Sequence, residues 1–117
     1  SDEQINLLSK LVAAEARGES YEGQVAVAAV VLNRVQDSRF PDSIEGVIYQ
    51  KNAFSVVRNG YIKAERTEES DKAVKDALYG NDPTNNAIYF WNPDISTCNW
   101  INTLNPHLRI GNHVFAR

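Results

Sequence analysis

Glu15 lies in an apolar stretch of the sequence, LVAAEARGES (residues 11–20). It falls at helical spacing on one stripe with four apolar residues, Leu7, Leu8, Leu11 and Val12. Its position near the end of the predicted helix adds the partial negative charge of unpaired carbonyl groups. The apolar stripe and the negative helix end both disfavour an ionised carboxylate, so we expect a raised pKa for Glu15. A carboxyl group that keeps its proton near neutral pH can donate it to a glycosidic oxygen.

A structural role for Glu15 is the alternative. Arg17 and Arg34 are the cations that could pair with it, and a buried ion pair also perturbs pKa values. The sequence leaves both interpretations open.

Glu19 is the second carboxylate of this stretch. If the helix continued, Glu15 and Glu19 would be neighbours on one face, with Cβ atoms ~6 Å apart. Their repulsion would raise the pKa of Glu15. Retaining glycosidases instead place two carboxylates on opposite sides of the scissile bond, ~5–5.5 Å apart. The spacing therefore argues against a two-carboxylate mechanism, unless Gly18 redirects the chain.

Aromatic residues form a second candidate cluster, since the apolar faces of sugar rings stack on aromatic rings: Phe54, Tyr61, Tyr89, Phe90, Trp91 and Trp100. The alternative is that most of them belong to the core. In a strand at 87–91, successive side chains point to opposite faces, so Ile88 and Phe90 lie on one face and Tyr89 and Trp91 on the other. We expect the Tyr89 side to face the ligand.

The helices that would position these residues have clear start and stop signals. A helix over 3–17 ends at Gly18, and Ser20 caps a second one over 21–36 that is apolar on all sides between Val25 and Leu32. Asp42 with Glu45 predicts a capping box for a short helix. Thr67 predicts the cap of a last helix, which is ended by Gly80 and Pro83 and carries one apolar stripe: Ala73, Val74, Ala77 and Leu78.

Two hairpins are predicted beside these helices. Asn59-Gly60 separates two extended runs, and both residues accept the positive φ that a tight hairpin turn requires. Gly111-Asn112 predicts a second turn near the end of the chain. The expected fold class is α+β, with a mainly helical core and small β-hairpins, in a single domain over residues 1–117.

Composition excludes several classes of function. The net charge is -3 and no long basic block occurs, so binding of nucleic acid is not expected. No apolar run reaches the ~18 residues of a transmembrane helix. His107 and His113 have no Cys or carboxylate residues nearby at the spacing of metal ligands, so we expect neither a metal nor a cofactor. We expect Cys98 to be a small, semi-buried residue. Methionine is absent, which indicates a processed product or part of a longer protein.

Seven segments together resemble the catalytic domain of the SleB/CwlJ cell-wall hydrolase family, the spore cortex-lytic enzymes. They are AAEARGE (13–19), YEGQVAVAAVVLNRV (21–35), FP (40–41), GVIYQ (46–50), AFSVVRNG (53–60), AIYFWNP (87–93) and IGNHVFAR (110–117). The AIYFWNP and IGNHVFAR segments are closer to the SleB-like branch than to the CwlJ-like branch. The chain departs from the pattern at Cys98 and in NTLNPHL (102–108).

This resemblance implies a lysozyme-like fold of the lytic transglycosylase kind, with Glu15 as the catalytic acid. The substrate would be cortex peptidoglycan containing muramic-δ-lactam, cut between N-acetylmuramic acid and N-acetylglucosamine. The enzyme would be exported to the spore cortex, could depend on a YpeB-like regulatory protein, and is expected to be a monomer. A peptidoglycan-binding module could precede Ser1. The expected substrate-binding residues are Glu19, Gln24, Phe54, Ser55, Tyr89 and Asn92.

In a transglycosylation, one carboxyl group suffices, because the C6 hydroxyl of the muramyl ring replaces water and gives a 1,6-anhydro product. A hydrolysing muramidase or glucosaminidase is one alternative, with Glu19 or a loop aspartate (Asp42, Asp82 or Asp94) activating water. A sugar-binding module without chemistry is the other alternative.

Overall fold

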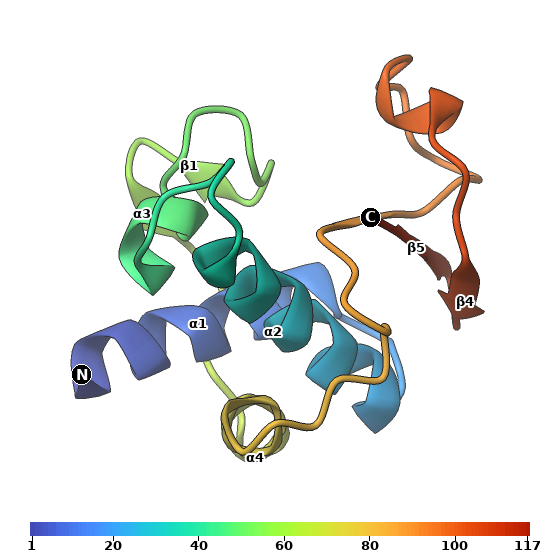
Figure 1. The fold of residues 1–117 in the computed structure, drawn as a ribbon. Helices are drawn as coiled ribbons and strands as arrows, with labels where there is room; N and C mark the ends of the chain where they lie inside the picture. Colours follow the sequence, from blue (N-terminus) through green and yellow to red (C-terminus); the bar gives the residue numbers. More distant parts are fainter.

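The computed structural model describes all of the chain, Ser1–Arg117. Its helices are α1 (Asp2–Glu15), α2 (Tyr21–Gln36), α3 (Ile44–Ile48) and α4 (Glu68–Leu78), with a short 3-10 helix at Ile101–Thr103. Its strands are β1 (Val57–Arg58), β2 (Tyr61–Ile62), β3 (Tyr89–Trp91), β4 (Leu108–Ile110) and β5 (His113–Ala116). The predicted α+β class is confirmed (Figure 1). None of the helices combines the length and the apolar character needed to cross a membrane.

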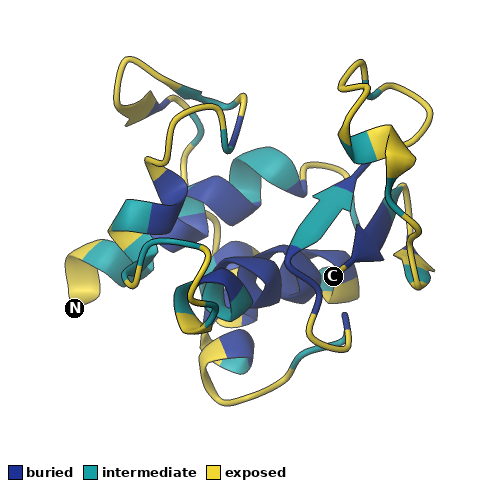
Figure 2. Ribbon diagram, turned by 45° about the horizontal axis from the view of Figure 1, so that its top comes forward, coloured by how far each residue is buried: buried dark blue, intermediate teal, exposed yellow.

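Helix α2 is the centre of the core, as its all-round apolar sequence predicts. Every residue from Gly23 to Val31 is buried. The other three helices pack around α2, and strands β3 and β4 contact it as well. Figure 2 shows the buried residues concentrated in these central helices. The predicted cap is confirmed, since Ser20 Oγ accepts a hydrogen bond from the amide of Gly23 at 3.2 Å.

Helix α1 ends earlier than its predicted range of 3–17. Its last residue is Glu15, and the chain then turns through Gly18, whose φ of +79° lies in the left-handed region. The residues Leu8, Leu11 and Val12 are fully buried. The apolar stripe therefore anchors α1 in the core and fixes the position of Glu15 at its end.

The caps of the two shorter helices include one correction. Ser43, not Asp42, caps α3, because α3 begins at Ile44 and the amide of its third residue, Gly46, lies within reach of Ser43 Oγ at 2.9 Å. In α4, Thr67 and Ser70 form a capping box, in which the side chain of each residue accepts a hydrogen bond from the backbone amide of the other.

The two antiparallel sheets lie on different sides of α2 (Figure 1). Strands β1 and β2 form the predicted hairpin, and both Asn59 and Gly60 have positive φ. The second sheet has the order β3-β5-β4, so the predicted hairpin at Gly111 gains β3 as a third strand. The register pairs Phe90 with Phe115.

Candidate active site

Glu15 is the last residue of α1, and its carboxyl group takes part in no salt bridge. Burial raises the pKa of Glu15 from 4.5 to about 7, and the positive charge of Arg34 acts in the opposite direction. The salt bridges of the structure all lie elsewhere: Arg39–Asp37, Arg66–Asp71 and Arg109–Asp94. The structural ion pair between Glu15 and Arg17 or Arg34 is therefore not formed, and the raised pKa comes from burial.

Arg34 is a buried cation that is held by groups other than Glu15. Its Nε donates a hydrogen bond to the carbonyl of Ile88 at 2.7 Å. Its guanidinium carbon lies 5.0, 5.3 and 5.7 Å from the ring centroids of Phe40, Phe54 and Tyr89. Arg34 therefore supplies a fixed positive potential near Glu15 and keeps its pKa from rising further.

A cleft of about 520 Å³ opens at Glu15, between the end of α1 and the sheet of β3, β5 and β4. One wall comes from the end of α1, the turn that follows it, and the loop before β1. The other wall comes from β3, the loop after it and the β4–β5 turn. Its lining residues include Glu15, Arg17, Glu19, Ser55, Phe90, Trp91, Asn92, Asn112 and His113. No group of three His, Cys, Asp or Glu side chains in the chain is arranged to hold a metal ion.

Glu19 connects the two walls of this cleft. Its carboxylate accepts hydrogen bonds from the backbone amide of Asn112 at 3.1 Å and from Asn112 Nδ2 at 3.0 Å. A Cβ at position 111 would lie 2.3 Å from Glu19 Oε1, so a side chain there would force the Glu19 carboxylate to move. Because the chain turns at Gly18, Glu19 does not continue the helical face that carries Glu15. Its carboxylate instead ties the end of α1 to the β4–β5 turn on the opposite wall of the cleft.

His113 is a cleft residue that sequence reasoning missed. Its Nδ1 is buried without a hydrogen-bond partner, and its ring contacts Phe90 edge to face at 5.1 Å. Burial lowers the pKa of His113, while the charge of Glu19 opposes this effect. The only sequence signal was its position in the IGNHVFAR segment, together with Asn112.

The structure brings four of the seven predicted site residues together: Glu15, Glu19, Ser55 and Asn92 all line the cleft. Ser55 is exposed. The side-chain oxygen of Asn92 accepts a hydrogen bond from the amide of Asp94 at 2.9 Å, which leaves its NH₂ group for a ligand.

The other three predicted residues lie elsewhere. Gln24 donates a hydrogen bond to Glu69, and Phe54 is only 5% exposed within the main core. Tyr89 packs edge to face on Phe40 and Trp100, with ring centroids 6.2 and 5.3 Å apart. The expected orientation of Tyr89 toward the ligand differs from the observed one, because these two rings hold it while Phe90 and Trp91 line the cleft.

Cys98 requires a correction as well. It is exposed and lines the cleft, whereas the sequence predicted a semi-buried residue. It lies in the long loop between β3 and β4, where the large apolar side chains of Ile95 and Trp100 are themselves exposed and do not cover it.

The raised pKa of Glu15 predicts how stability changes with pH. An acid whose pKa rises on folding contributes stability that is complete below its unfolded value, near 4.5, and is lost as pH rises through about 7. A shift of this size corresponds to about 3 kcal/mol. Glu15→Gln should therefore match the wild type at pH 4 and exceed its free energy of unfolding by about 2–3 kcal/mol at pH 8.5. Urea unfolding at both pH values measures this difference, and equal stabilities at pH 8.5 would contradict it.

A second prediction concerns Gly111. Gly111→Ala should displace Glu19 and break its hydrogen bonds to Asn112, in addition to the strain at a φ of +59°. Gly60→Ala is the matched control, since Gly60 has a similar φ of +71° with no atom within 4 Å. We expect about 1 kcal/mol of destabilisation for Gly60→Ala and about 1–2 kcal/mol more for Gly111→Ala. Denaturation curves of both variants test this, and equal losses would show that the Glu19 contact is unimportant.

Comparison with known proteins gives a consistent family. A family model described as Cell Wall Hydrolase matches residues 18–116, a range that begins after Glu15. The chain is 47% identical over 117 residues to a spore cortex-lytic enzyme of Oceanobacillus iheyensis. That match covers 100% of the chain and 42% of the relative, so the chain spans less than half of that protein's length.

Two solved structures share the fold over the whole chain. The catalytic domain of the Bacillus cereus SleB protein has a TM-score of 0.91 at 47% identity, with 91% of that chain covered. The catalytic domain of SleB from Bacillus anthracis, described as a germination-specific lytic transglycosylase, has a TM-score of 0.93 at 46% identity, with 96% covered. The predicted fold and the predicted resemblance to SleB are thereby confirmed. The chain belongs to the cell wall hydrolase family.

Proposed function

We propose that this chain cleaves the glycosidic bond between N-acetylmuramic acid and N-acetylglucosamine in peptidoglycan, as a lytic transglycosylase. The observation that carries this proposal is the unpaired carboxyl group of Glu15 in the cleft. Its pKa of about 7 suits a group that first donates and then recovers a proton. A module that only binds sugars has no need of such an acid in its cleft.

The distribution of the other carboxylates favours transglycosylation over hydrolysis. Glu19 is the only other carboxylate that lines the cleft, and it is engaged by Asn112. The three loop aspartates considered for activating water do not line it: Asp42, Asp82 and Asp94. Asp82 instead accepts hydrogen bonds from Asn33 and Thr84. A hydrolase would need a second carboxylate across the scissile bond.

In the proposed reaction, Glu15 transfers its proton to the glycosidic oxygen while the bond from that oxygen to muramyl C1 breaks. The N-acetylglucosamine end leaves with a free hydroxyl group, and the muramyl ring develops oxocarbenium character. The ring's own O6 then bonds to C1, and the Glu15 carboxylate takes the proton from O6. No water is consumed, and the tethered hydroxyl outcompetes water because of its high effective concentration.

The family relationship supports a spore cortex substrate, because the relatives are named for cortex lysis and germination. We propose muramic-δ-lactam-containing cortex as the substrate and an extracytoplasmic site of action. The chain would act as one catalytic domain and as a monomer, and a YpeB-like protein would regulate it. Ser55 and the NH₂ group of Asn92, which both line the cleft, would bind the sugar and its N-acetyl group.

The test is to digest purified cortex with the chain, reduce the fragments with borohydride and determine their masses. We expect 1,6-anhydro ends, which resist reduction and are lighter by one water than hydrolysed ends. Fragments that carry mainly reducible ends would reject the transglycosylase mechanism and support the hydrolase. Intact cortex, with binding only, would support the sugar-binding module.

A further inference from the structure

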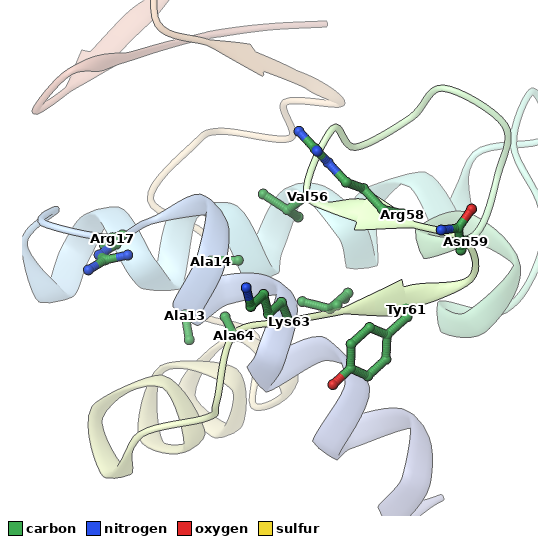
Figure 3. A pocket seen from close by; sticks show the side chains of 10 residues that line it. Ala13, Ala14, Arg17, Val56, Arg58, Asn59, Tyr61, Lys63 and Ala64 are labelled. Atoms are coloured by element: carbon green, nitrogen blue, oxygen red, sulfur yellow. The ribbon is translucent and has the colours of Figure 1, made fainter.

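A second cavity, of about 730 Å³, lies outside the Glu15 cleft. It is formed between the last turns of α1 and the β1–β2 hairpin (Figure 3). Its apolar lining comes from small and branched side chains: Ala13, Ala14, Val56, Ile62 and Ala64. We call it the hairpin cavity.

The polar lining of the hairpin cavity is cationic. Arg17, Arg58 and Lys63 line it, all three are exposed, and none takes part in a salt bridge. Figure 3 shows Arg17 at the end of α1, with Arg58 and Lys63 on the hairpin side. No carboxylate lines the cavity, although the whole chain has a net charge of -3. The cavity therefore concentrates unpaired positive charge above an apolar surface, which suits an anionic ligand with small apolar groups.

The hairpin cavity adjoins the Glu15 cleft. Arg17 lines both, and Ala14 of the cavity precedes Glu15 of the cleft in the last turn of α1. A ligand held at Glu15 can therefore extend past Arg17 into the hairpin cavity without leaving the surface of the protein.

We propose that the hairpin cavity binds the stem peptide of a peptidoglycan strand whose sugars occupy the Glu15 cleft, an inference that rests on the proposed function. The stem peptide carries free carboxylates and alanine methyl groups, which match the cations and the apolar lining. The glycan chain itself offers mainly neutral hydroxyl and N-acetyl groups. Asn59 and Tyr61, which also line the cavity, can hydrogen-bond the peptide amides.

The experiment uses ¹⁵N-labelled chain carrying Glu15→Gln, so that ligands are bound without being cut. Three soluble fragments with the same glycan, which contains both muramic-δ-lactam and peptide-bearing muramyl residues, are titrated: one with free stem peptides, one with amidated peptide carboxylates, and one with the peptides removed. Arg58→Gln combined with Lys63→Gln tests the cavity, since neither residue lines the Glu15 cleft. Lys10→Gln with Lys75→Gln is the control, with the same change in charge at positions outside both sites.

We expect the peptide-bearing fragment to shift signals in both sites and to bind roughly 3- to 20-fold more tightly than the amidated one, given the modest strength of exposed ion pairs. The cavity variant should lose this preference, and the control should keep it. Shifts in the cleft alone, or equal affinity for all three fragments, would overturn the stem-peptide proposal while leaving the proposed function intact. No shift in the cleft with any fragment would instead reject the proposed function.

Phosphatidylglycerol vesicles and an unrelated acidic peptide serve as competitors in the same titration. If either displaces the peptide-bearing fragment from the hairpin cavity at equal carboxylate or phosphate concentration, the cavity recognises negative charge in general and the proposal is overturned. We expect neither to do so, because only the peptidoglycan strand is also held through the Glu15 cleft.

Discussion

Glu15→Gln is expected to lower the rate of cortex lysis by roughly 10²–10⁴-fold, the usual contribution of general acid–base catalysis. Glutamine has nearly the same shape and fits the end of α1, but it cannot donate a proton to the leaving oxygen or recover one from O6. The raised pKa of about 7 adds a second expectation for the wild type. Its rate should fall as pH rises above about 7, because the acid form of Glu15 is then lost. Turbidity of decoated spores and product release over a pH series measure both effects.

Glu65→Gln is a suitable control for this experiment, since Glu65 is exposed and lies outside the cleft. It should lyse cortex at the wild-type rate. A folded Glu15→Gln variant with the same rate as this control would remove Glu15 from the mechanism.

Arg34→Leu is expected to lower the free energy of unfolding by about 2–4 kcal/mol. Leucine fills part of the space, but the carbonyl of Ile88 loses its donor, and a buried unpaired carbonyl costs about 1–3 kcal/mol. The contacts of the guanidinium with the faces of Phe40 and Phe54 are lost as well. Removal of the positive charge should also raise the pKa of Glu15 and move the alkaline limb of the pH–rate profile to higher pH.

Arg39→Leu is the matched control for Arg34→Leu. Arg39 is exposed and pairs only with Asp37 at the surface, so this variant should lose less than about 1 kcal/mol. Thermal and urea denaturation give the two stabilities, and pH–rate profiles give the shift. If Arg34→Leu leaves the alkaline limb unchanged, the charge of Arg34 does not reach Glu15.

The sequence predicted best what depends on neighbouring residues. The burial of Glu15 follows from the helical stripe of α1 and the end of that helix, which are set within one short segment. The turn at Asn59-Gly60 and the cap at Ser20 are equally local, because each requires only the φ or side-chain oxygen of its own residues. These features were confirmed for that reason.

The opposite wall of the cleft could not be predicted in the same way. Glu19 and Asn112 are 93 positions apart, and nothing near either residue indicates the contact. The orientation of Tyr89 depends on Phe40 and Trp100, which come from other parts of the chain. Strand alternation gives two faces but not which face meets the substrate. His113 was missed because its role follows from its place in the folded cleft.

The position of β5 has a consequence for the order in which the molecule is made. Strand β5 comes last in the sequence but lies in the middle of the three-stranded sheet, between β3 and β4. During translation β3 emerges long before its only partner, so this sheet closes through contacts of long sequence separation that form late. The helices can associate earlier, because α1, α2 and α4 precede the sheet in the sequence. A chain lacking residues 113–116 should therefore hold a helical core without the second wall of the Glu15 cleft, because neither β3 nor β4 then has a partner strand.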